Sequence, residues 1–305
     1  MQAYFALSRT SHALLDIAAP ACCALLWLGG FPPVPTVLLA LVTAFAAYTA
    51  VYALNDLIGI DSDREKFAGS VPTNDGYSVE AYAQRHPLAQ NILGMRNAVL
   101  WTVGWLLVAL VGCYLLNPAT ALILLVAAVL EILYCLLLKV TCLKTIVSGF
   151  VKAAGPVAAI FAVDPQPSPR LLLVVFAWIF FWEIGGQNVP SDWNYTAEDR
   201  RARAKTVVLS LGFRKAGRVV MLTLLFSVLM SGLLPLVSPA RFGLLYALGS
   251  VLLGYVLLLR PGFRLYQAGA EGELAARLFD RASYYPLAQF GLVAGFLLAQ
   301  RLIGA

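Results

Sequence analysis

The stretch Asn55-Asp56-Leu57-Ile58-Gly59-Ile60-Asp61-Ser62-Asp63-Arg64 comes directly after an apolar run that begins near residue 34. It places three aspartates within eight residues, in a chain of which only 12% is charged. Carboxylates are costly near a membrane and persist there mainly where they bind something. A second cluster with acidic residues, 188–199, follows another apolar run. Two such clusters at helix ends predict a divalent-metal site, because Mg²⁺ takes carboxylates together with the phosphates of a substrate.

The composition of the chain is that of a membrane protein. Of its 305 residues 60% are hydrophobic, and the mean hydropathy is +0.79, which excludes a soluble globular protein. Apolar segments of about 20 residues span a bilayer as helices. Nine are predicted, at 11–30, 34–55, 93–115, 118–138, 145–163, 169–190, 215–236, 240–259 and 283–302. We expect an all-α, polytopic fold and one domain over 1–305, because no polar block is large enough to fold separately.

The distribution of Lys and Arg predicts the orientation in the membrane. Connections after the second, fourth, sixth and eighth segments are rich in basic residues, whereas the opposite side carries only Arg170, Arg241 and Arg301. We therefore expect the N-terminus and both acidic clusters on the cytoplasmic side of a bacterial inner membrane. The net charge of +6 reflects this bias and indicates contact with membrane lipid, not with nucleic acid.

Long polar connections on the cytoplasmic side are expected to carry the functional motifs, at about 56–92 and 188–213, since long loops in a compact protein are usually functional or disordered. Within the first of them, 69–76 is rich in turn residues and 78–85 is predicted as a short interfacial helix.

In the first cluster, helical spacing puts Asp56 and Asp63 on one face, with Asn55 and Gly59 beside them. Asp61 points elsewhere unless the helix opens, and Gly59 is where opening is easiest. In that case the Asp61 carboxylate would face the second cluster.

In the second cluster, Asn188, Asp192 and Asp199 form one stripe, with Tyr195 between the two aspartates. Two facing stripes of this kind are expected to hold Mg²⁺ against a diphosphate. Basic residues beside them would neutralise the remaining phosphate charge: Arg64, Arg200, Arg201, Arg203 and Lys205. Either cluster alone also fits solvated carboxylates that pair with neighbouring arginines; the two together favour the functional interpretation.

The chain resembles the UbiA superfamily of intramembrane prenyltransferases, whose first motif is NDxxDxxxD after the second helix. Asn55, Asp56 and Asp63 match its first, second and last positions. Gly59 replaces the middle aspartate, and Asp61 is the nearest substitute.

The second motif of that family is DxxxD, followed by a basic residue and Thr. Asp199 and Lys205-Thr206 match the later part, while Tyr195 takes the place of the first aspartate and leaves Asp192 as its stand-in. The family also has a Tyr-Lys pair at the end of the fourth helix, which Tyr134 and Lys139 resemble with one residue more between them.

The resemblance implies nine helices around a central cavity and a role for each matched residue. The implied Mg²⁺ ligands are Asp56, Asp61, Asp63, Asp192 and Asp199. The implied diphosphate-binding residues are Asn55, Arg64, Lys139, Asn188, Arg200 and Lys205. The implied catalytic residues are Tyr134, Asp192 and Asp199.

The implied activity is Mg²⁺-dependent transfer of a prenyl group from a polyprenyl or allylic diphosphate to an aromatic or lipidic acceptor, with release of diphosphate. A terpene cyclase of the same superfamily is an alternative. A transporter of anionic metabolites is another, although coupling sites of transporters usually lie near the bilayer midplane, whereas these motifs lie at helix ends.

Four ionisable residues lie inside apolar runs, and such residues are functional candidates: Asp16, Glu131, Lys152 and Glu183. We expect Lys152 to pair with Glu131 or Glu183; alternatively, one of the carboxylates takes a proton from the acceptor. Arg9 and His12 precede the first helix, where we expect them to anchor it at the membrane surface.

Overall fold

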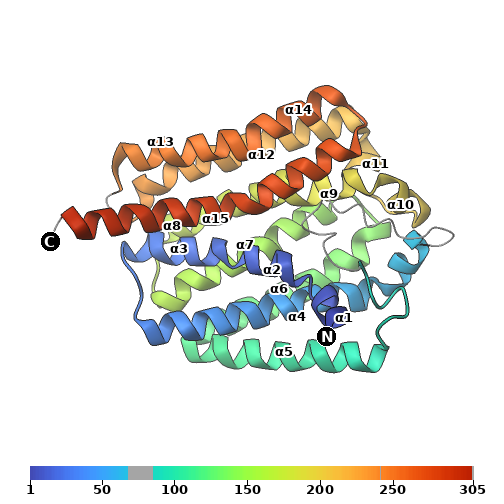
Figure 1. Cartoon of the computed structure of the whole chain (residues 1–305), viewed down its shortest axis with the longest axis horizontal. Coiled ribbons are helices and arrows are strands. Elements are labelled where there is room, and N and C mark those ends of the chain that lie inside the picture. Colours follow the sequence, from blue (N-terminus) through green and yellow to red (C-terminus); the bar gives the residue numbers. More distant parts are fainter. Residues whose placement is uncertain (68–84, 241, 304–305) are drawn as a thin grey trace.

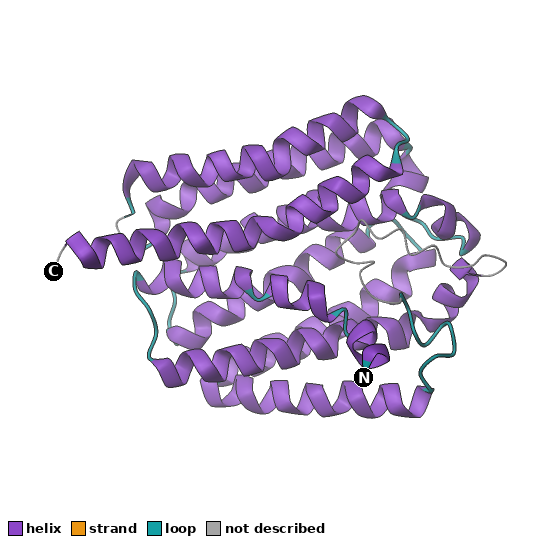
Figure 2. Ribbon diagram, viewed as in Figure 1, coloured by secondary structure: helices purple, strands orange, loops and turns teal. Residues whose placement is uncertain are grey.

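The computed structural model describes residues 1–67, 85–240 and 242–303. Within these ranges the chain is helical with short loops and has no strand (Figure 2). The predicted turn at 69–76 and almost all of the predicted helix at 78–85 lie outside the described residues. The all-α class that the composition predicts is confirmed.

The first half of the described chain contains α1 (Gln2–Leu7), α2 (Thr10–Asp16), α3 (Ala18–Leu28), α4 (Val34–Phe67), α5 (Met95–Leu116), α6 (Pro118–Leu136), η1 (Leu137–Lys139) and α7 (Lys144–Val163). The second half contains α8 (Pro169–Trp182), η2 (Glu183–Asn188), α9 (Val189–Asn194), α10 (Thr196–Arg201), α11 (Val207–Leu211), α12 (Phe213–Val237), α13 (Gly243–Gly254), η3 (Tyr255–Leu259), α14 (Arg260–Ala268) and α15 (Gly272–Ile303). The segments η2 and η3 are π-helical and join their neighbours into continuous rods.

Among the described residues, nine helical spans are long and apolar enough to cross a membrane, so the predicted number is confirmed. Some helices run further than predicted. α4 continues to Phe67, beyond the apolar segment that ends at 55, and α15 begins at Gly272, ahead of the apolar segment that begins at 283. The apolar pattern marks only the part of a helix that lies in lipid, whereas the backbone hydrogen bonds continue into the polar part.

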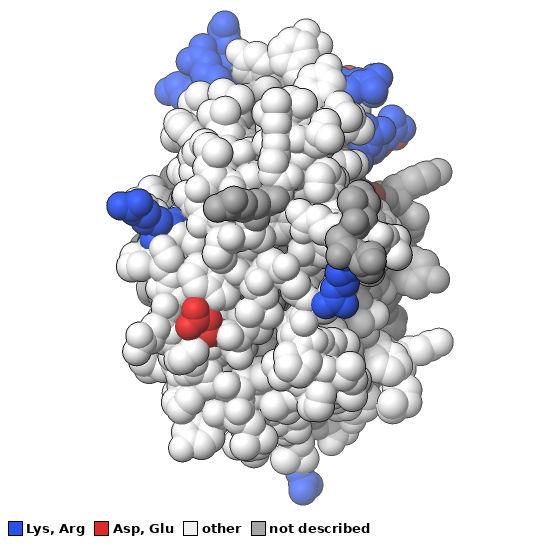
Figure 3. Space-filling model, turned by 90° about the vertical axis from the view of Figure 1, so that its left-hand side faces the viewer, with Lys and Arg blue, Asp and Glu red and all other residues white. Residues whose placement is uncertain are grey.

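The spans run back and forth, so that the chain begins and ends at opposite ends of the bundle (Figure 1). α4 packs along α5, α8 along α12, and α7 lies against α3 and α6. The second half contains the large buried aromatic side chains Trp178, Trp182, Trp193, Tyr246 and Tyr285. The end that carries the C-terminus shows a largely uncharged surface with a few scattered charged side chains (Figure 3). Both acidic motifs lie at the opposite end.

The contact between α4 and α5 depends on Gly112. A Cβ atom added there would lie 2.1 Å from Thr43 Oγ1 and 3.0 Å from Thr43 Cβ. We therefore expect Gly112→Ala to lower the free energy of unfolding by about 1–3 kcal/mol, the usual cost of overpacking, as thermal unfolding in detergent would show. Gly104→Ala on the same helix is the control, because nothing lies within 4 Å of its added Cβ. Equal melting temperatures for the two variants would contradict this account.

Candidate active site

A cavity of about 530 Å³ runs along the bundle from the motif end toward the opposite end. Its polar end is lined by Asp63, Lys66, His86, Asp192 and Asp199, among others. Its far end is apolar and is lined by residues that include Phe31, Pro32, Leu116 and Val163. The cavity thus joins a charged mouth to an apolar interior.

Two of the three aspartates of the first motif form a tight cluster with a histidine. Oxygen atoms of Asp56 and Asp63 and a ring nitrogen of His86 lie within 4.8 Å of one another. Asp56 and Asp63 share a face because α4 continues without a break, and both are buried. His86 Nδ1 lies 3.1 Å from Asp56 Oδ1 and 2.9 Å from Asp63 Oδ2. The backbone of His86 adopts a left-handed conformation with φ +49°, which is uncommon outside glycine.

The charge of this cluster favours a cation at its centre. Burial alone disfavours a protonated imidazole, but the carboxylates of Asp63 and Asp56 more than offset this effect and raise the pKa of His86 to about 9. Carboxylate oxygens are also the ligands that Mg²⁺ prefers. The residues present therefore fit a divalent ion that would take over the positive charge now on His86.

Lys66 connects the two motifs. Its Nζ lies 3.4 Å from Asp63 Oδ1 and 3.5 Å from Asp199 Oδ1. Asp199 is 2% exposed, so this ammonium group holds the start of α10 against the end of α4. Beside it, Arg85 forms a two-pronged pair with Glu198, at 3.2 and 3.0 Å, and its guanidinium stacks on the ring of Tyr195.

A second buried network surrounds Asp192. Lys144, whose side chain is fully buried, donates to both oxygens of Asp192 at 3.1 Å and to the Tyr134 hydroxyl at 3.3 Å. The Tyr134 hydroxyl also accepts from Asn188 Nδ2 at 3.0 Å. Thr145 Oγ1 donates to Asn188 Oδ1 at 2.7 Å and fixes the orientation of that amide. Five side chains from three segments of the bundle, α6, α7 and η2–α9, are thereby held as one unit.

Asp61 does not join this site. α4 passes through Gly59 without opening, so the expectation that the helix breaks there is wrong. The Asp61 side chain is 89% exposed, and its ion pair is with Arg64, 3.7 Å away. A side chain five residues from Asp56 points to another face of a regular helix. Arg64, which is half exposed, turns away from the cavity with it.

Lys139 is also placed elsewhere than expected. α6 ends at Leu136, and the tighter turn η1 directs Lys139 outward to Glu65, 2.6 Å away. Lys144, at the start of α7, takes the position beside Tyr134 and Asp192. Two further basic residues proposed for diphosphate binding, Arg200 and Lys205, have exposed side chains outside the cavity lining.

The structure adds four basic residues to the mouth of the cavity that the motifs did not indicate as ligands: Lys66, Arg85, His86 and Lys144. Lys66 follows Asp63 at i+3, a spacing that brings side chains together on a helix. Extending the predicted helix by one turn past Asp63 would therefore have found it. His86 and Lys144 carry no such signal, because each reaches the site through a change in chain direction.

The four ionisable residues inside the membrane pair differently from the prediction. Lys152 Nζ bonds Asp16 Oδ2 at 2.6 Å and Tyr52 hydroxyl at 3.0 Å, not Glu131 or Glu183. The Tyr52 hydroxyl also donates to Asp16. The prediction failed because Asp16 lies far from Lys152 in the sequence, and only the packing of α3, which begins just after Asp16, against α7 brings the two side chains together.

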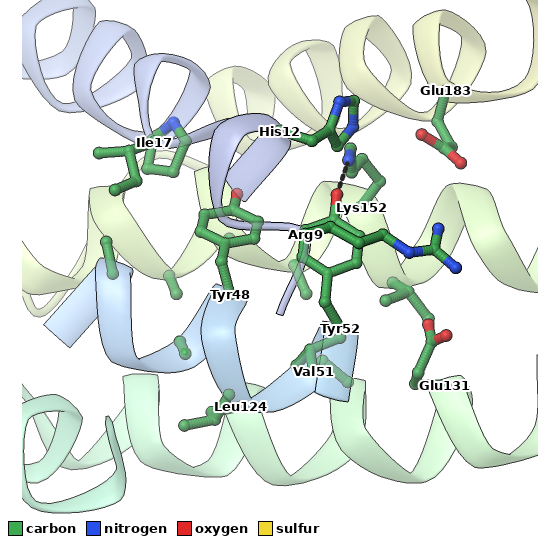
Figure 4. A pocket seen from close by; sticks show the side chains of 18 of the residues that line it. Arg9, His12, Ile17, Tyr48, Val51, Tyr52, Leu124, Glu131, Lys152 and Glu183 are labelled. Atoms are coloured by element: carbon green, nitrogen blue, oxygen red, sulfur yellow. Dashed lines mark hydrogen bonds between the residues drawn. The ribbon is translucent and has the colours of Figure 1, made fainter. Parts of the chain in front are cut away.

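Arg9 and His12 reach the cavity instead of remaining only at the surface (Figure 4). Arg9 lies 3.6 Å from Asp56 and donates to Asn55 Oδ1 at 3.4 Å. Asn55 in turn donates to Glu131 Oε1 at 2.5 Å. The N-terminal segment therefore contributes charge to the motif end of the site.

Comparisons with known proteins bear on the family and the fold of this chain. The profile of the UbiA prenyltransferase family matches residues 17–283. No curated protein sequence matches the chain. Among solved structures, the fold is similar to a UbiA homologue from Aeropyrum pernix K1, with 14% identity, 96% of this chain and 98% of that chain covered, and a TM-score of 0.71.

Two further structures share the fold. One is a UbiA homologue from Archaeoglobus fulgidus bound to DMAPP and Mg²⁺, with 14% identity, 95% and 99% coverage, and a TM-score of 0.68. The other is a digeranylgeranylglyceryl phosphate synthase, with 15% identity, 97% and 96% coverage, and a TM-score of 0.66.

Proposed function

The chain belongs to the UbiA prenyltransferase family, and we propose that it transfers a prenyl group from an allylic or polyprenyl diphosphate to an acceptor inside the membrane, with Mg²⁺ as cofactor. One observation carries the proposal. A single cavity has carboxylates and ammonium groups at its mouth and apolar side chains in its interior. An isoprenoid diphosphate has the same division, with a charged head and an apolar tail.

We assign the metal to the first motif and its partner in the second. Asp56 and Asp63 would hold the ion, with Asp199 reaching it from α10 and Asp192 facing it beside Lys144. When bound, Mg²⁺ neutralises charge on the leaving diphosphate and so favours its departure. Structures of the Archaeoglobus fulgidus homologue with DMAPP and with GPP, each together with Mg²⁺, support this cofactor and this class of donor.

The basic side chains at the mouth would bind the diphosphate. Lys66, Lys144 and Arg9 line the cavity beside the aspartates, and Asn55 and Asn188 add amide groups. Fixed cations aimed at the charge that develops on a leaving group are usually the largest contribution to such a reaction. These residues replace Arg64, Lys139, Arg200 and Lys205 in the assignment.

Tyr134 would assist the departure of diphosphate. Its hydroxyl oxygen already accepts from Lys144 and Asn188, which leaves its own proton to donate to the bridging oxygen of the substrate. Its ring, with the Lys144 ammonium 4.8 Å from the centroid, lies at the level where an allylic cation would form. Aromatic faces stabilise cations, and the apolar walls behind it exclude water.

We further propose that the chain forms one functional domain and lies in a bacterial inner membrane with the motif end in the cytoplasm. The Lys and Arg asymmetry supports this orientation, as does the need of the site for Mg²⁺ and a phosphorylated substrate. The membrane lipid would then surround the apolar spans and supply the route by which the prenyl tail enters.

The test is diphosphate release from geranyl diphosphate by the purified protein in detergent. We expect release that requires Mg²⁺, stops with EDTA and increases with an acceptor. Release of the same size without any acceptor, with a cyclic hydrocarbon or alcohol as product, would identify a cyclase. Binding without any bond cleavage, with or without Mg²⁺, would contradict the proposal.

A further inference from the structure

A second polar layer lies deeper in the cavity than the diphosphate-binding residues. On α7, Ser148 and Lys152 follow Lys144 by one and two turns, which places them roughly 6 and 12 Å further along the helix axis at the usual rise. On α6, Glu131 lies almost one turn deeper than Tyr134. The level of Ser148, one turn beyond Lys144, is where the allylic carbon and an acceptor would meet, just beyond the diphosphate.

Glu183 occupies this layer with one oxygen committed and the other without a partner. Ser148 Oγ donates to Glu183 Oε1 at 2.6 Å. Glu183 Oε2 is buried and has no hydrogen-bond partner among the described residues, while the residue as a whole is 7% exposed and lines the cavity. A buried carboxylate oxygen without a partner is costly, so the position calls for a ligand that donates a hydrogen bond.

The backbone and the neighbouring side chains fix this carboxylate. Glu183 begins the π-helical segment η2, and π-helical turns are frequent at functional sites. Ser148 accepts in turn from Asn188 Nδ2 at 3.2 Å, and Asn188 bonds Tyr134. Glu183 is thereby connected through hydrogen bonds to the residues that would bind the diphosphate.

The charge of the layer indicates which acceptors fit. Two carboxylates, Glu131 and Glu183, line this layer, and its two fixed cations, Lys152 and Arg9, are each already paired with a further carboxylate (Figure 4). Lys152 pairs with Asp16, and Arg9 is shared with Asp56 of the metal cluster. Other polar groups that face the layer are His12, Tyr52 and Ser148. An anionic acceptor would add negative charge where carboxylates already outnumber cations, at a low dielectric that strengthens the repulsion.

We propose that Glu183 is the proton acceptor of a subsite built for an uncharged acceptor that carries a hydroxyl group. The inference rests on the proposed function. The bond between the allylic carbon and the diphosphate oxygen breaks, and its electron pair leaves with diphosphate. The allylic carbon bonds to the nucleophilic atom of the acceptor, and the proton that this atom loses passes to Glu183 Oε2. No further reactant is needed.

The test uses two acceptors that differ only in charge, methyl 4-hydroxybenzoate and 4-hydroxybenzoate. Their binding is measured by calorimetry on the full-length protein with Mg²⁺ and geranyl thiolodiphosphate, an analogue that does not react. We expect the ester to bind at least about 10-fold more tightly, a difference of about 1.4 kcal/mol in binding free energy. Equal binding, no binding of either compound, or tighter binding of the carboxylate would overturn the proposal.

Two variants then separate a base from a structural carboxylate. Glu183→Gln keeps the size of the side chain and its contact with Ser148, but cannot take a proton. Transfer from geranyl diphosphate to the ester should fall about 100-fold, within the range of lost general-base catalysis, and the loss of rate toward low pH should disappear. Binding of geranyl thiolodiphosphate should change less than about twofold, since the diphosphate residues are untouched.

Glu131→Gln is the matched comparison, because it removes another carboxylate from the same cavity. Unlike Glu183 Oε2, the Oε1 atom of Glu131 already accepts a hydrogen bond from Asn55. It should keep the decline in rate toward low pH. Identical rates and pH profiles for the two variants, or ester that binds to the wild type without being prenylated, would overturn the role of Glu183. If geranyl thiolodiphosphate does not bind to the wild type in the presence of Mg²⁺, the proposed function is overturned instead. The preference between the two acceptors can still be measured by their own binding to the protein.

Discussion

Replacing Asp63 with Asn should lower prenyl transfer by about 100-fold, equivalent to about 3 kcal/mol of lost transition-state stabilisation. Asp63 contacts both His86, at 2.9 Å, and Lys66, at 3.4 Å. Its carboxylate therefore belongs both to the metal cluster and to the ion pair with Lys66, which in turn contacts Asp199. Steady-state release of diphosphate at saturating Mg²⁺ measures the effect, and the Mg²⁺ concentration for half-maximal rate should rise.

Asp61→Asn is the matched control for this prediction. It makes the same change two residues away on the same helix, in a side chain that is 89% exposed. Its turnover and its response to Mg²⁺ should equal those of the wild type. A loss of activity in Asp61→Asn comparable to that in Asp63→Asn would show that the cluster described here is not the metal site.

Replacing Lys144 with Met should be the most damaging change of a basic residue. Lys144 is completely buried and is the ion-pair partner of Asp192 at 3.1 Å. Removing one partner of a buried pair leaves an uncompensated charge and typically costs about 3–5 kcal/mol. We expect a lower melting temperature in detergent together with a loss of geranyl diphosphate turnover of at least about 100-fold.

Lys139→Met is the control that distinguishes a role of Lys144 from a role of Lys139. Lys139 pairs with Glu65 at the surface, and both side chains are at least 40% exposed, so its pair should contribute about 0–1 kcal/mol. Melting temperature and KM for the diphosphate should both stay close to the wild type. If Lys139→Met raises KM while Lys144→Met does not, the motif lysine is Lys139 and the assignment made from the structure is wrong.

The fold could be predicted because it depends on a local property of the chain. Whether about 20 consecutive residues are apolar decides whether they can cross a bilayer, and no distant residue is needed to judge it. The nine spans therefore followed from the composition of each segment. The positions of helix ends beyond the lipid could not be predicted in this way, since backbone hydrogen bonds continue α4 to Phe67 without any apolar signal.

The aspartates of the candidate site could be found by spacing on a single helix. Asp56 and Asp63 share a face at i and i+7, as a regular helix requires, and both are buried. The same rule should have excluded Asp61. The proposed opening at Gly59 relied on the flexibility of a single glycine, whereas the structure shows a continuous helix there.

The sequence by itself determined the class of fold, the number of spans and the acidic stripe of the first motif, because each is set by residues close together in the chain. The predicted stripe of the second motif is not a single helical face, since Asp192 lies on α9 and Asp199 on α10, on either side of the break at Tyr195. Only the tertiary structure decided which cations meet the aspartates of the two motifs. Contact between α4 and α10 placed Lys66 against Asp199, and the turn after α6 placed Lys144 instead of Lys139 beside Asp192. Packing between distant helices made Asp16 the partner of Lys152. A buried charge must find its partner in space, and neighbours in space are fixed only when the helices have packed.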